Sequence, residues 1–361
     1  MREGWEIKTI GDVCDILDRK RKPISKRDRE PGPYPYYGAS CIQDYVSGYL
    51  FDGRYLLIGE DGAKWGPGED TAYIAEGKFW VNNHAHILKA KEGYLDDFLR
   101  YYIKHLDLNP IVAGAIIPKL TQEKLATLEV PIPSLPEQQR IVDILDREFA
   151  KIDALKANAE KCLQAAKDLF QATLKKEIEP KEGWVIKPFG EICDIFDKRR
   201  KPISKRDREP GPYPYYGASC IQDYVKDYLF DGRYLLIGED GAKWGPGDDT
   251  AYIVEGKFWV NNHAHIVKAR DGFLDDYLRY YIKQLDLNPL VAGAIIPKLT
   301  QEKLVALEIP VPSFELQQEI VSKLDNLNDR CNTLQENYQK TLTLCDDLKQ
   351  SLLRKAFNGE L

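Results

Sequence analysis

The stretch GKFWVNNHAH occupies residues 77–86 and recurs without a change at residues 256–265 of this 361-residue chain. The repeat extends much further, because a constant offset of 179 aligns residues 4–134 with residues 183–313 without a gap, and only 23 of these 131 positions differ. An internal repeat of this kind decides how the fold is read, so each copy is interpreted as one domain.

The identity between the two copies includes polar loop residues as well as apolar ones. A buried core requires only compatible apolar volumes, so identity in polar loops predicts that the two domains have the same surface chemistry and bind the same ligand. A recent duplication that has had no time to diverge explains the identity equally well, and it leads to the same expectation.

Each copy combines signals for strands and for helices. Tyr55–Ile58 and Phe79–Val81 are expected to form strands bounded by turn signals. Between residues 95 and 103 apolar side chains recur at helical spacing, which predicts an amphipathic helix. A shorter helix is expected to begin with Thr121 as its N-cap. Each domain should therefore have a mixed α/β fold.

A different kind of segment follows each copy. Glycine and proline are missing from residue 137 to residue 178, and apolar residues recur there with alternating steps of four and three, interrupted at Glu148. The segment after the second copy has the same spacing, although its sequence has diverged. This heptad pattern predicts two long coiled-coil helices. The expected seam residues are Ile141, Leu145, Ile152, Leu155, Leu169, Ile320, Leu324, Leu327, Leu334 and Leu348.

The expected organisation is a domain at residues 1–134, a helix at 135–179, a second domain at 180–313 and a second helix at 314–361. At about 1.5 Å per residue, each helix of roughly 40 residues has a length of about 60 Å. Two seams of equal length are expected to pair in antiparallel fashion, because a parallel pair requires a long return connection. The chain is then an α+β protein with pseudo-twofold symmetry and a domain at each end of a rod.

The composition excludes several classes of protein. With 43% hydrophobic and 30% charged residues the chain is not disordered, and no apolar run approaches the ~20 residues that a membrane span needs. The N-terminus lacks an export signal, so a cytoplasmic protein without membrane contact is expected. Seven scattered cysteines without a C-x-x-C pair argue against a disulfide framework or a zinc site. The net charge of −6 argues against a nucleic-acid ligand unless the basic residues are clustered.

The basic residues are in fact clustered. Between Asp18 and Glu30 there are seven basic and three acidic residues, and several tyrosines follow. Basic side chains suit phosphates and aromatic rings can stack, so this loop is expected to contact nucleic acid; the alternative is a solvated loop over a tyrosine-rich core. The candidates are Arg21, Lys22, Lys26, Arg27, Arg29, Tyr36 and Tyr37, with Arg200, Lys201, Lys205, Arg206, Arg208, Tyr215 and Tyr216 in the second copy.

Two further places supply candidate residues for DNA contact. A glycine-rich loop follows the first expected strand, and binding residues often lie in such loops, so Lys64 and Trp65 are expected to enter a DNA groove. Lys119 precedes the short helix and is expected either to reach a phosphate or to remain in solvent. The equivalent residues of the second copy are Lys243, Trp244 and Lys298.

The segment NNHAH at residues 82–86 has three interpretations. His84 and His86 could hold a metal ion, an asparagine could read adenine, or the segment could be a hydrogen-bonded framework, which is favoured because no other histidine is matched in both copies. Catalytic motifs such as G-x-S-x-G are missing, and Glu76–Lys78 has only the short E-x-K form that arises by chance. No catalytic residue, bound metal or cofactor is therefore expected.

Five motifs together resemble the specificity (S) subunit of Type I restriction-modification enzymes. They are GPYPYYGAS (32–40), YLLIGEDG (55–62), GKFWVNNHAH (77–86), VPIPSLPEQQRIV (130–142) and LKQSLLRKAFNGEL (348–361). The resemblance covers essentially the whole chain, and the last two motifs are the most characteristic. It implies two target recognition domains, each of which reads half of a bipartite double-stranded DNA site, separated by helices that bind two methyltransferase subunits.

The resemblance also implies where the chemistry takes place. The methyltransferase partners bind S-adenosylmethionine and methylate adenine, restriction subunits are further partners, and the chain itself catalyses nothing. Typical members have two dissimilar recognition domains, whereas the copies here are nearly the same, so the expected target is an interrupted inverted repeat. The alternatives are a solitary DNA-binding regulator without methyltransferase partners and an enzyme that cuts DNA unaided.

Overall fold

The computed structural model describes residues 4–112, 118–291 and 297–361. They form two compact units. Unit 1 combines the chain up to Glu160 with Tyr338–Leu361, and unit 2 is Lys161–Asn337. Each unit contains one copy of the repeat, called domain 1 or domain 2, and one half of each of two long helices. These helices are α4 (Leu135–Ile178) and α9 (Phe314–Asn358).

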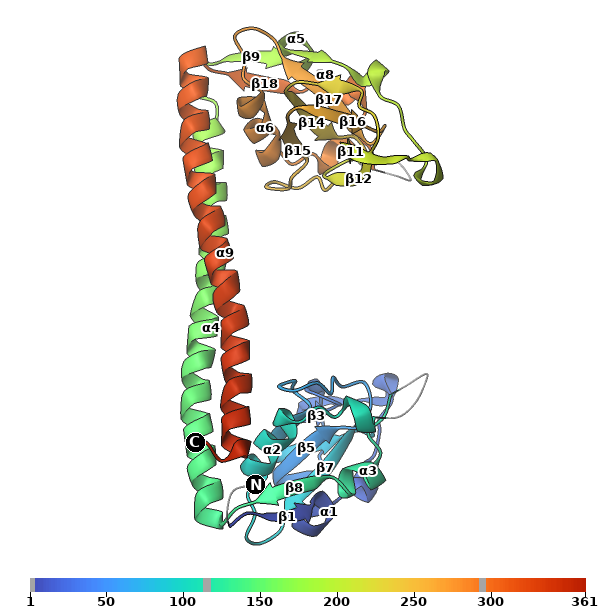
Figure 1. Ribbon diagram of the computed structural model, residues 1–361, viewed down its shortest axis with the longest axis vertical. Coiled ribbons are helices and arrows are strands. Elements are labelled where there is room, and N and C mark those ends of the chain that lie inside the picture. Colours follow the sequence, from blue (N-terminus) through green and yellow to red (C-terminus); the bar gives the residue numbers. More distant parts are fainter. Residues whose placement is uncertain (1–3, 113–117, 292–296) are drawn as a thin grey trace. The chain divides into compact units, whose positions relative to one another are not determined.

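Domain 1 is built on a six-stranded mixed sheet in the order β2-β7-β5-β6-β3-β4 (Figure 1). Neighbouring strands are antiparallel except for the pair β3 and β6, which is parallel. The strands are β2 (Cys14–Ile16), β3 (Pro31–Tyr37), β4 (Ile42–Val46), β5 (Phe51–Gly59), β6 (Ala72–Val81) and β7 (Ala85–Ala90). The two predicted strands lie within β5 and β6, which confirms them.

The central strand β5 is buried on both faces. Leu56 packs into a cluster with Phe98 of helix α2 (Asp96–His105), whereas Leu57 packs on the opposite face with Phe79. Successive side chains of a strand point to opposite faces, so an unbroken apolar run is the expected sequence for such a strand. The predicted amphipathic helix is therefore confirmed as α2, which covers one face of the sheet (Figure 1).

The first and last strands of domain 1 lie side by side. Strand β1 (Glu6–Thr9) pairs antiparallel with β8 (Glu129–Ile132), and Glu6 is opposite Ile132 (Figure 1). The short helices α1 (Ile10–Val13) and α3 (Gln122–Ala126) lie next to this pair. The hydroxyl group of Thr121 accepts a hydrogen bond from the N–H group of Lys124 at 3.4 Å, so Thr121 is the N-cap of α3, as predicted.

A buried glutamine joins each domain to the helix that follows it. The side chain of Gln138 accepts a hydrogen bond from the N–H of Leu95 at 3.1 Å and donates one to the carbonyl of Pro133 at 3.0 Å. Gln317 makes the equivalent bonds with Leu274 and Pro312. A buried amide that uses both its donor and its acceptor fixes the direction in which the helix leaves the domain.

Domain 2 repeats this architecture. Its strands form the series β10-β17-β14-β15 and β12-β11-β16-β13, and reciprocal backbone hydrogen bonds of 3.0 Å between Gly232 and Gly256 connect the two series. The strands and helices are β9 (Val185–Pro188), α5 (Phe189–Ile192), β10 (Cys193–Ile195), β11 (Pro210–Tyr216), β12 (Ile221–Val225), β13 (Phe230–Asp231), β14 (Tyr234–Gly238), β15 (Ala251–Val254), β16 (Lys257–Val260), β17 (Ala264–Ala269), α6 (Asp275–Gln284), α7 (Asn288–Val291), α8 (Gln301–Val305) and β18 (Glu308–Val311).

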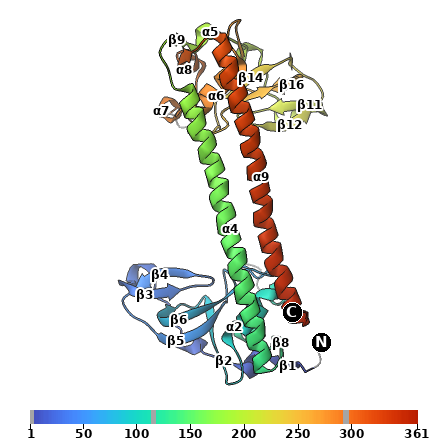
Figure 2. The same ribbon diagram turned by 90° about the vertical axis from the view of Figure 1, so that its left-hand side faces the viewer.

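Within unit 1 the two long helices run antiparallel (Figure 2). Arg140 near the start of α4 donates a hydrogen bond to the carbonyl of Leu361 at 2.8 Å, whereas Lys156 further along α4 lies 2.8 Å from Asp346. The partner's residue number falls as the α4 number rises, which defines the direction. In unit 2, Lys323 of α9 lies 2.5 Å from Glu177 of α4.

The predicted seam needs a correction. Ile141, Leu145, Ile152, Ile320 and Leu324 are buried and Leu327 is half-buried. The other four predicted seam residues are between 43% and 54% exposed and do not belong to the seam: Leu155, Leu169, Leu334 and Leu348.

Two neighbouring aromatic residues are buried: Phe149, which follows Glu148, and Phe170, which follows Leu169. The physical reason is that the helix packs on its domain as well as on the other helix. The ring of Phe149 is 5.3 Å from that of Tyr101 in α2, and the ring of Phe170 is 6.3 Å from that of Tyr280 in α6. A heptad pattern describes two helices and does not include this third partner.

None of the described helices combines the length and the apolar composition that a membrane span requires.

Candidate nucleic-acid interface

The basic loop connects β2 to β3 and contains two short 3-10 turns, Asp18–Lys20 and Lys26–Asp28. Its backbone is held by hydrogen bonds to side chains of the sheet. Trp80 Nε1 donates a hydrogen bond to the carbonyl of Lys22 at 2.6 Å, and the N–H of Ile24 donates to the hydroxyl of Tyr36 at 3.0 Å. The loop is therefore a defined platform, and its side chains divide into two groups.

The first group consists of arginines that hold the loop in place. Arg21 is largely buried, donates a hydrogen bond to the carbonyl of Ala85 at 2.8 Å and forms an ion pair with Glu60. Arg29 lies over the ring of Tyr36, 4.3 Å from its centroid, and pairs with Asp44 at 3.1 Å. The sequence predicts DNA contacts for these two arginines and their equivalents Arg200 and Arg208, but all four guanidinium groups are used within the domain, which gives them a supporting role.

The second group points into solvent. Lys22, Lys26 and Arg27 are exposed, and the side chain of Arg27 is 89% exposed. Lys201, Lys205 and Arg206 have the same exposed positions in domain 2. These six cations remain candidates for phosphate contacts, because an exposed charge can reach a ligand without breaking an internal bond.

The tyrosines behind the loop also divide. Tyr36 and Tyr215 are 1% exposed, so the prediction that they contact DNA is wrong. For these two residues the alternative interpretation, a tyrosine-rich core beneath the loop, is correct. Tyr37 and Tyr216 are half-buried, and burial raises the pKa of both hydroxyl groups. The ring of Tyr37 packs against Phe79 with the centroids 5.6 Å apart.

The two candidate residues of the glycine-rich loop, Lys64 and Trp65, differ in exposure. The side chain of Lys64 is 82% exposed, and Lys243 is exposed too, so both remain candidates. Trp65 and Trp244 are 8% and 7% exposed and belong to the apolar cores, so the prediction that they enter a DNA groove is wrong. An indole ring contributes more stability by packing in the core than it can at an exposed loop position.

Lys119 and Lys298 each form an ion pair with a glutamate of their own domain. The ammonium group of Lys119 lies 2.6 Å from Glu60, and that of Lys298 lies 2.9 Å from Glu239. Both lysines are about 40% exposed, but their charge is already balanced by a buried carboxylate. The alternative of free solvation is therefore wrong, and the lysines close a buried network, whereas a phosphate contact by these lysines stays a prediction.

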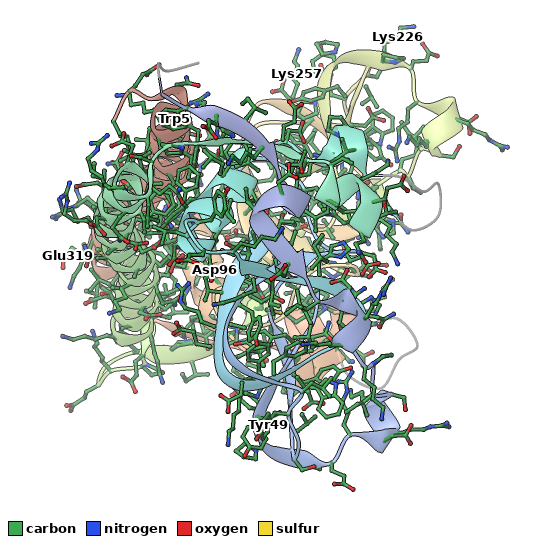
Figure 3. The ribbon with its side chains drawn as sticks, turned by 90° about the horizontal axis from the view of Figure 1, so that it is seen from below. Trp5, Tyr49, Asp96, Lys226, Lys257 and Glu319 are labelled. Carbon is green, nitrogen blue, oxygen red and sulfur yellow. The ribbon has the colours of Figure 1, made fainter. Side chains whose placement is uncertain are left out.

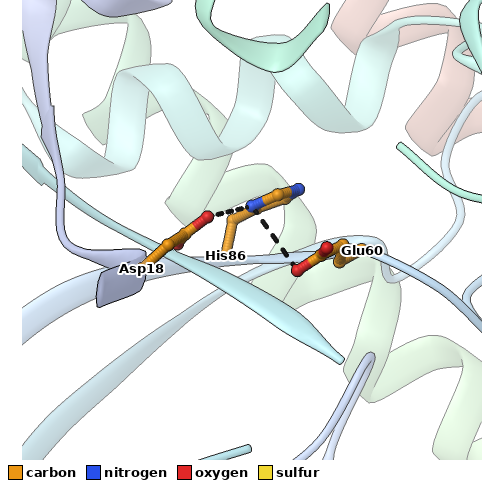
Figure 4. Close-up of side chains that lie close together, drawn as sticks. All are labelled: Asp18, Glu60 and His86. Atoms are coloured by element: carbon orange, nitrogen blue, oxygen red, sulfur yellow. Dashed lines mark hydrogen bonds and ion pairs between the residues drawn. The ribbon is translucent and has the colours of Figure 1, made fainter. Parts of the chain in front are cut away.

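This network has Asp18, Glu60 and His86 at its centre (Figure 4). One oxygen of Asp18 lies 2.5 Å from Nδ1 of His86, and the other accepts a hydrogen bond from the N–H of Ile87 at 3.0 Å. Nε2 of His86 lies 2.7 Å from the carbonyl of Leu120. Asp197, Glu239 and His265 repeat the arrangement in domain 2.

The donor atoms of this cluster are close enough to hold a metal ion, since they lie within 4.8 Å of one another. However, Arg21 pairs with both carboxylates, Lys119 pairs with Glu60, and both nitrogens of His86 face protein oxygens. A metal ion would have to displace two cations, so the residues fit a charge-balanced framework better than a metal site.

Asn82 of the same segment fits the framework as well. Asn82 is 2% exposed, donates a hydrogen bond to Gln43 at 3.0 Å and accepts one from the N–H of His84 at 2.7 Å. Its amide group is therefore used within the domain, which excludes the interpretation that Asn82 reads adenine. Asn261 makes the same bonds in domain 2.

A surface that the sequence did not indicate lies beside the basic loop. Tyr45 of β4 is 52% exposed and Tyr49 is 43% exposed, and Tyr34 and Lys78 contact the ring of Tyr49. We call Tyr34, Tyr45, Tyr49 and Lys78 the tyrosine patch. Strand β4 is the last strand of its sheet, which explains why these rings are left uncovered.

None of the described cysteines in the sheet regions has the environment of a nucleophile. Cys14 and Cys193 are buried, and burial raises the pKa of the Cys14 thiol to about 12. A thiol with this pKa is protonated at neutral pH and reacts slowly.

The comparisons with known proteins identify the family of the chain. Residues 2–163 and 181–344 match the family model described as the Type I restriction modification DNA specificity domain. The chain belongs to this family. Members are the DNA-recognition subunits of type I restriction-modification systems and not their catalytic subunits, so the resemblance seen in the sequence and the prediction of a non-catalytic DNA-recognition chain are confirmed.

Curated relatives of this specificity subunit match over most of their length. A protein of Haemophilus influenzae named as a type I restriction enzyme specificity subunit is 28% identical, over 92% of this chain and 91% of the relative. The EcoDI specificity subunit of Escherichia coli is 22% identical, over 99% of this chain and 88% of the relative.

Solved structures show the same fold for the specificity subunit. One, from a study of complex assembly and conformational transition of the type I R-M system, covers 100% of this chain and 99% of its own, with a TM-score of 0.74 and 18% identity. The HsdS subunit of Thermoanaerobacter tengcongensis gives a TM-score of 0.55 at 18% identity, over 100% of this chain and 98% of its own. The predicted fold of two mixed α/β domains with two long helices is confirmed.

Proposed function

We propose that this specificity subunit reads a bipartite DNA site with two nearly identical half-sites in inverted orientation. The observation that carries the proposal is that the two domains are identical at 108 of the 131 aligned positions, exposed loop residues included. Lys22, Lys26 and Arg27 correspond to Lys201, Lys205 and Arg206. Since the exposed side chains select the ligand, two identical surfaces select the same half-site.

The inverted orientation follows from the way each unit is built. Unit 1 combines domain 1 with the first half of α4 and the second half of α9, and unit 2 combines domain 2 with the first half of α9 and the second half of α4. Each domain is thus joined to a helix pair of the same construction with the roles of α4 and α9 exchanged. Two units of the same construction, with α4 and α9 exchanged, support two half-sites of the same kind on opposite strands.

In this proposal residues 1–134 and 180–313 are the target recognition domains. Residues 135–179 and 314–361 are helices that bind two adenine methyltransferase subunits, with restriction subunits as further partners. Four exposed leucines support the docking role. Leu155 and Leu348 lie in unit 1, Leu169 and Leu334 lie in unit 2, and the offset of 179 relates Leu155 to Leu334 and Leu169 to Leu348.

The position of these leucines on the helices is the same in both units. Leu155 lies three residues after the buried Ile152, and Leu348 lies three residues after the buried Cys345. Equivalent flanking positions of an antiparallel pair lie on one face, so each unit presents two uncovered leucines together. The helices have otherwise diverged, and a partner that binds twice explains why both units keep this apolar pair.

Methylation mapping tests the proposed target. The chain is expressed with its adenine methyltransferase, and modified adenines are located by single-molecule sequencing. The expected result is one motif whose two halves are related by inversion and separated by a nonspecific spacer. Two unrelated half-sites would overturn the proposal of an inverted repeat, while the assignment to the family would stand.

Co-purification tests the proposed docking. Leu155→Lys together with Leu334→Lys is expected to abolish co-purification with the methyltransferase subunit, because each change places a charge in an apolar contact. Leu135→Lys is the matched control, since Leu135 is 45% exposed and lies at the start of α4. If the unmodified chain binds its DNA site without any methyltransferase partner, the alternative of a solitary regulator is correct.

A further inference from the structure

The tyrosine patch is a built surface and not a set of scattered side chains. The rings of Tyr34 and Tyr49 are 5.1 Å apart in an edge-to-face arrangement, and Nζ of Lys78 lies 4.8 Å from the centroid of Tyr49. Contact with the Tyr49 hydroxyl raises the pKa of Lys78, so the ammonium group stays charged. The patch thus combines exposed phenol groups with a fixed positive charge.

Domain 2 repeats the patch with the same residues. The rings of Tyr213 and Tyr228 are 5.0 Å apart, and Nζ of Lys257 lies 4.6 Å from the centroid of Tyr228. Tyr224 is 52% exposed, the same fraction as Tyr45. In Figure 3 Tyr49 lies at the opposite side of domain 1 from Trp5, and Lys226 and Lys257 lie near each other at the edge of domain 2.

The patch is continuous with the basic loop. The indole ring of Trp80 donates its hydrogen bond to Lys22 of the loop and also lies beneath Gly48, next to Tyr49. On the other side, Asp44 precedes Tyr45 in β4 and is held by Arg29, and the charge of Lys26 contributes to the lowered pKa of Asp44, after the hydrogen bonds from Tyr45 and Arg29. The same strands therefore support both the exposed loop cations and the exposed tyrosines.

We infer that the tyrosine patch is a second DNA-binding element of each domain, which contacts the sugar–phosphate backbone of duplex DNA beside the site reached by the basic loop. The inference rests on the proposed function, because it assigns further residues to the same DNA surface. The exposed hydroxyls of Tyr45 and Tyr49 donate hydrogen bonds to phosphate oxygens, and Lys78 supplies the charge.

Charge decides between DNA and other occupants of this surface. An uncovered edge strand can also pair with a strand of another protein chain. However, Lys22, Lys26 and Arg27 of the adjoining loop and Lys78 of the patch are all exposed cations, with Asp28 and Asp52 as nearby acids, although the whole chain carries a net charge of −6. A local excess of cations in an acidic protein matches a polyanion and would be repelled by a second copy of itself.

The contact is to the backbone and not to the bases. Phosphate contacts carry no sequence information, so they weaken binding equally for all sequences when they are lost. The two copies differ at one place within this surface, where Ser47 and Gly48 correspond to Lys226 and Asp227. Lys226 is paired with Glu209 at 2.8 Å, so it adds no free cation, whereas Asp227 adds an exposed carboxylate beside Tyr228 in domain 2.

The salt dependence of DNA binding by the full chain tests the inference. The probe is a fluorescent duplex of random sequence with about 40 base pairs, titrated by anisotropy between roughly 50 and 200 mM KCl. Lys78→Gln with Lys257→Gln is expected to lower the slope of log affinity against log salt by about 0.9 for each lost phosphate contact. Tyr49→Phe with Tyr228→Phe is expected to weaken binding about fivefold without a change of slope.

The matched control is Lys161→Gln with Lys340→Gln. These two lysines are exposed, lie at equivalent positions of α4 and α9, and lose the same charge. The control should keep the slope of the unmodified chain. An unchanged slope and affinity in the Lys78 and Tyr49 variants overturns the inference, as does a loss of self-association in sedimentation with no change in DNA binding. If the unmodified chain shows no salt-dependent binding at all, the inference fails, whereas the proposed function is tested separately by methylation mapping.

Discussion

Oδ2 of Asp18 lies 2.5 Å from Nδ1 of His86, and both side chains are buried. This contact joins the start of the basic loop to strand β7, and Arg21 extends it to Glu60 at the end of β5. The exposed cations of the loop therefore stand on a buried polar network, and the shape of the DNA-facing surface depends on residues that DNA does not touch.

The first prediction concerns this network. Asp18→Asn removes a buried charge that Arg21 and His86 both face, and it should lower the free energy of unfolding of domain 1 by about 3–5 kcal/mol, the usual cost of breaking a buried ion pair. Differential scanning calorimetry of the full chain measures the change. Asp15→Asn, at an exposed position of the adjacent strand β2, should change the stability by less than about 0.5 kcal/mol.

The second prediction separates structural from DNA-binding cations. Lys22→Gln with Lys201→Gln should reduce the salt slope of DNA binding by about 0.9 per phosphate and leave the melting temperature unchanged, because both side chains are exposed. Arg21→Gln with Arg200→Gln should instead lower the melting temperature, because it leaves Glu60 and Glu239 short of a partner. A stable Arg21 variant with reduced salt slope would contradict this division.

The third prediction concerns the corrected seam. Phe149→Ala removes a buried ring that packs on Tyr101 and should destabilise unit 1 by about 3–5 kcal/mol. Leu155→Ala, six residues later on the same helix, should cost less than about 1 kcal/mol because Leu155 is 50% exposed. Urea unfolding followed by circular dichroism distinguishes the two variants. A larger effect for Leu155 would mean that the heptad seam predicted from the sequence is correct.

The fourth prediction concerns the cysteines. Cys41 and Cys220 are exposed, whereas Cys14 is buried and its pKa is raised to about 12. The thiolate is the reactive form, so at pH 7.5 maleimide should modify Cys41 and Cys220 first and should reach Cys14 only after unfolding. Mass spectrometry of digested samples shows the order. Rapid labelling of Cys14 in the native chain would mean that β2 separates from β7 in solution.

Much of the fold was predictable because it depends on patterns along the chain. The offset of 179 defined the two domains, apolar spacing located α2, and Thr121 marked the start of α3. These signals are local or repeated, so one sequence is enough to see them. The long helices were predicted for the same reason, although four of the leucines assigned to their buried face are exposed.

The candidate site was less predictable, because the sequence shows which residues a loop contains but not where their side chains point. Arg21 and Lys22 are neighbours of the same charge, yet Arg21 is used inside the domain and Lys22 is exposed. Trp65 follows the exposed Lys64 into the core. Their partners, such as Glu60 for Arg21, are distant in sequence, and only the folded chain brings them together. The exposure of Tyr45 likewise depends on the position of β4 at the edge of the sheet.

The pairing of β1 with β8 has a consequence for how such proteins change. The chain enters and leaves domain 1 at adjacent strands, and domain 2 has the same arrangement in β9 and β18. A domain whose two ends meet behaves as a cassette: it can be cut out, copied or exchanged for another by a single recombination event without moving the helices on either side. The near-identity of the two halves is what such a copying event leaves behind, and replacing one cassette is the direct route to a subunit with a new, asymmetric target.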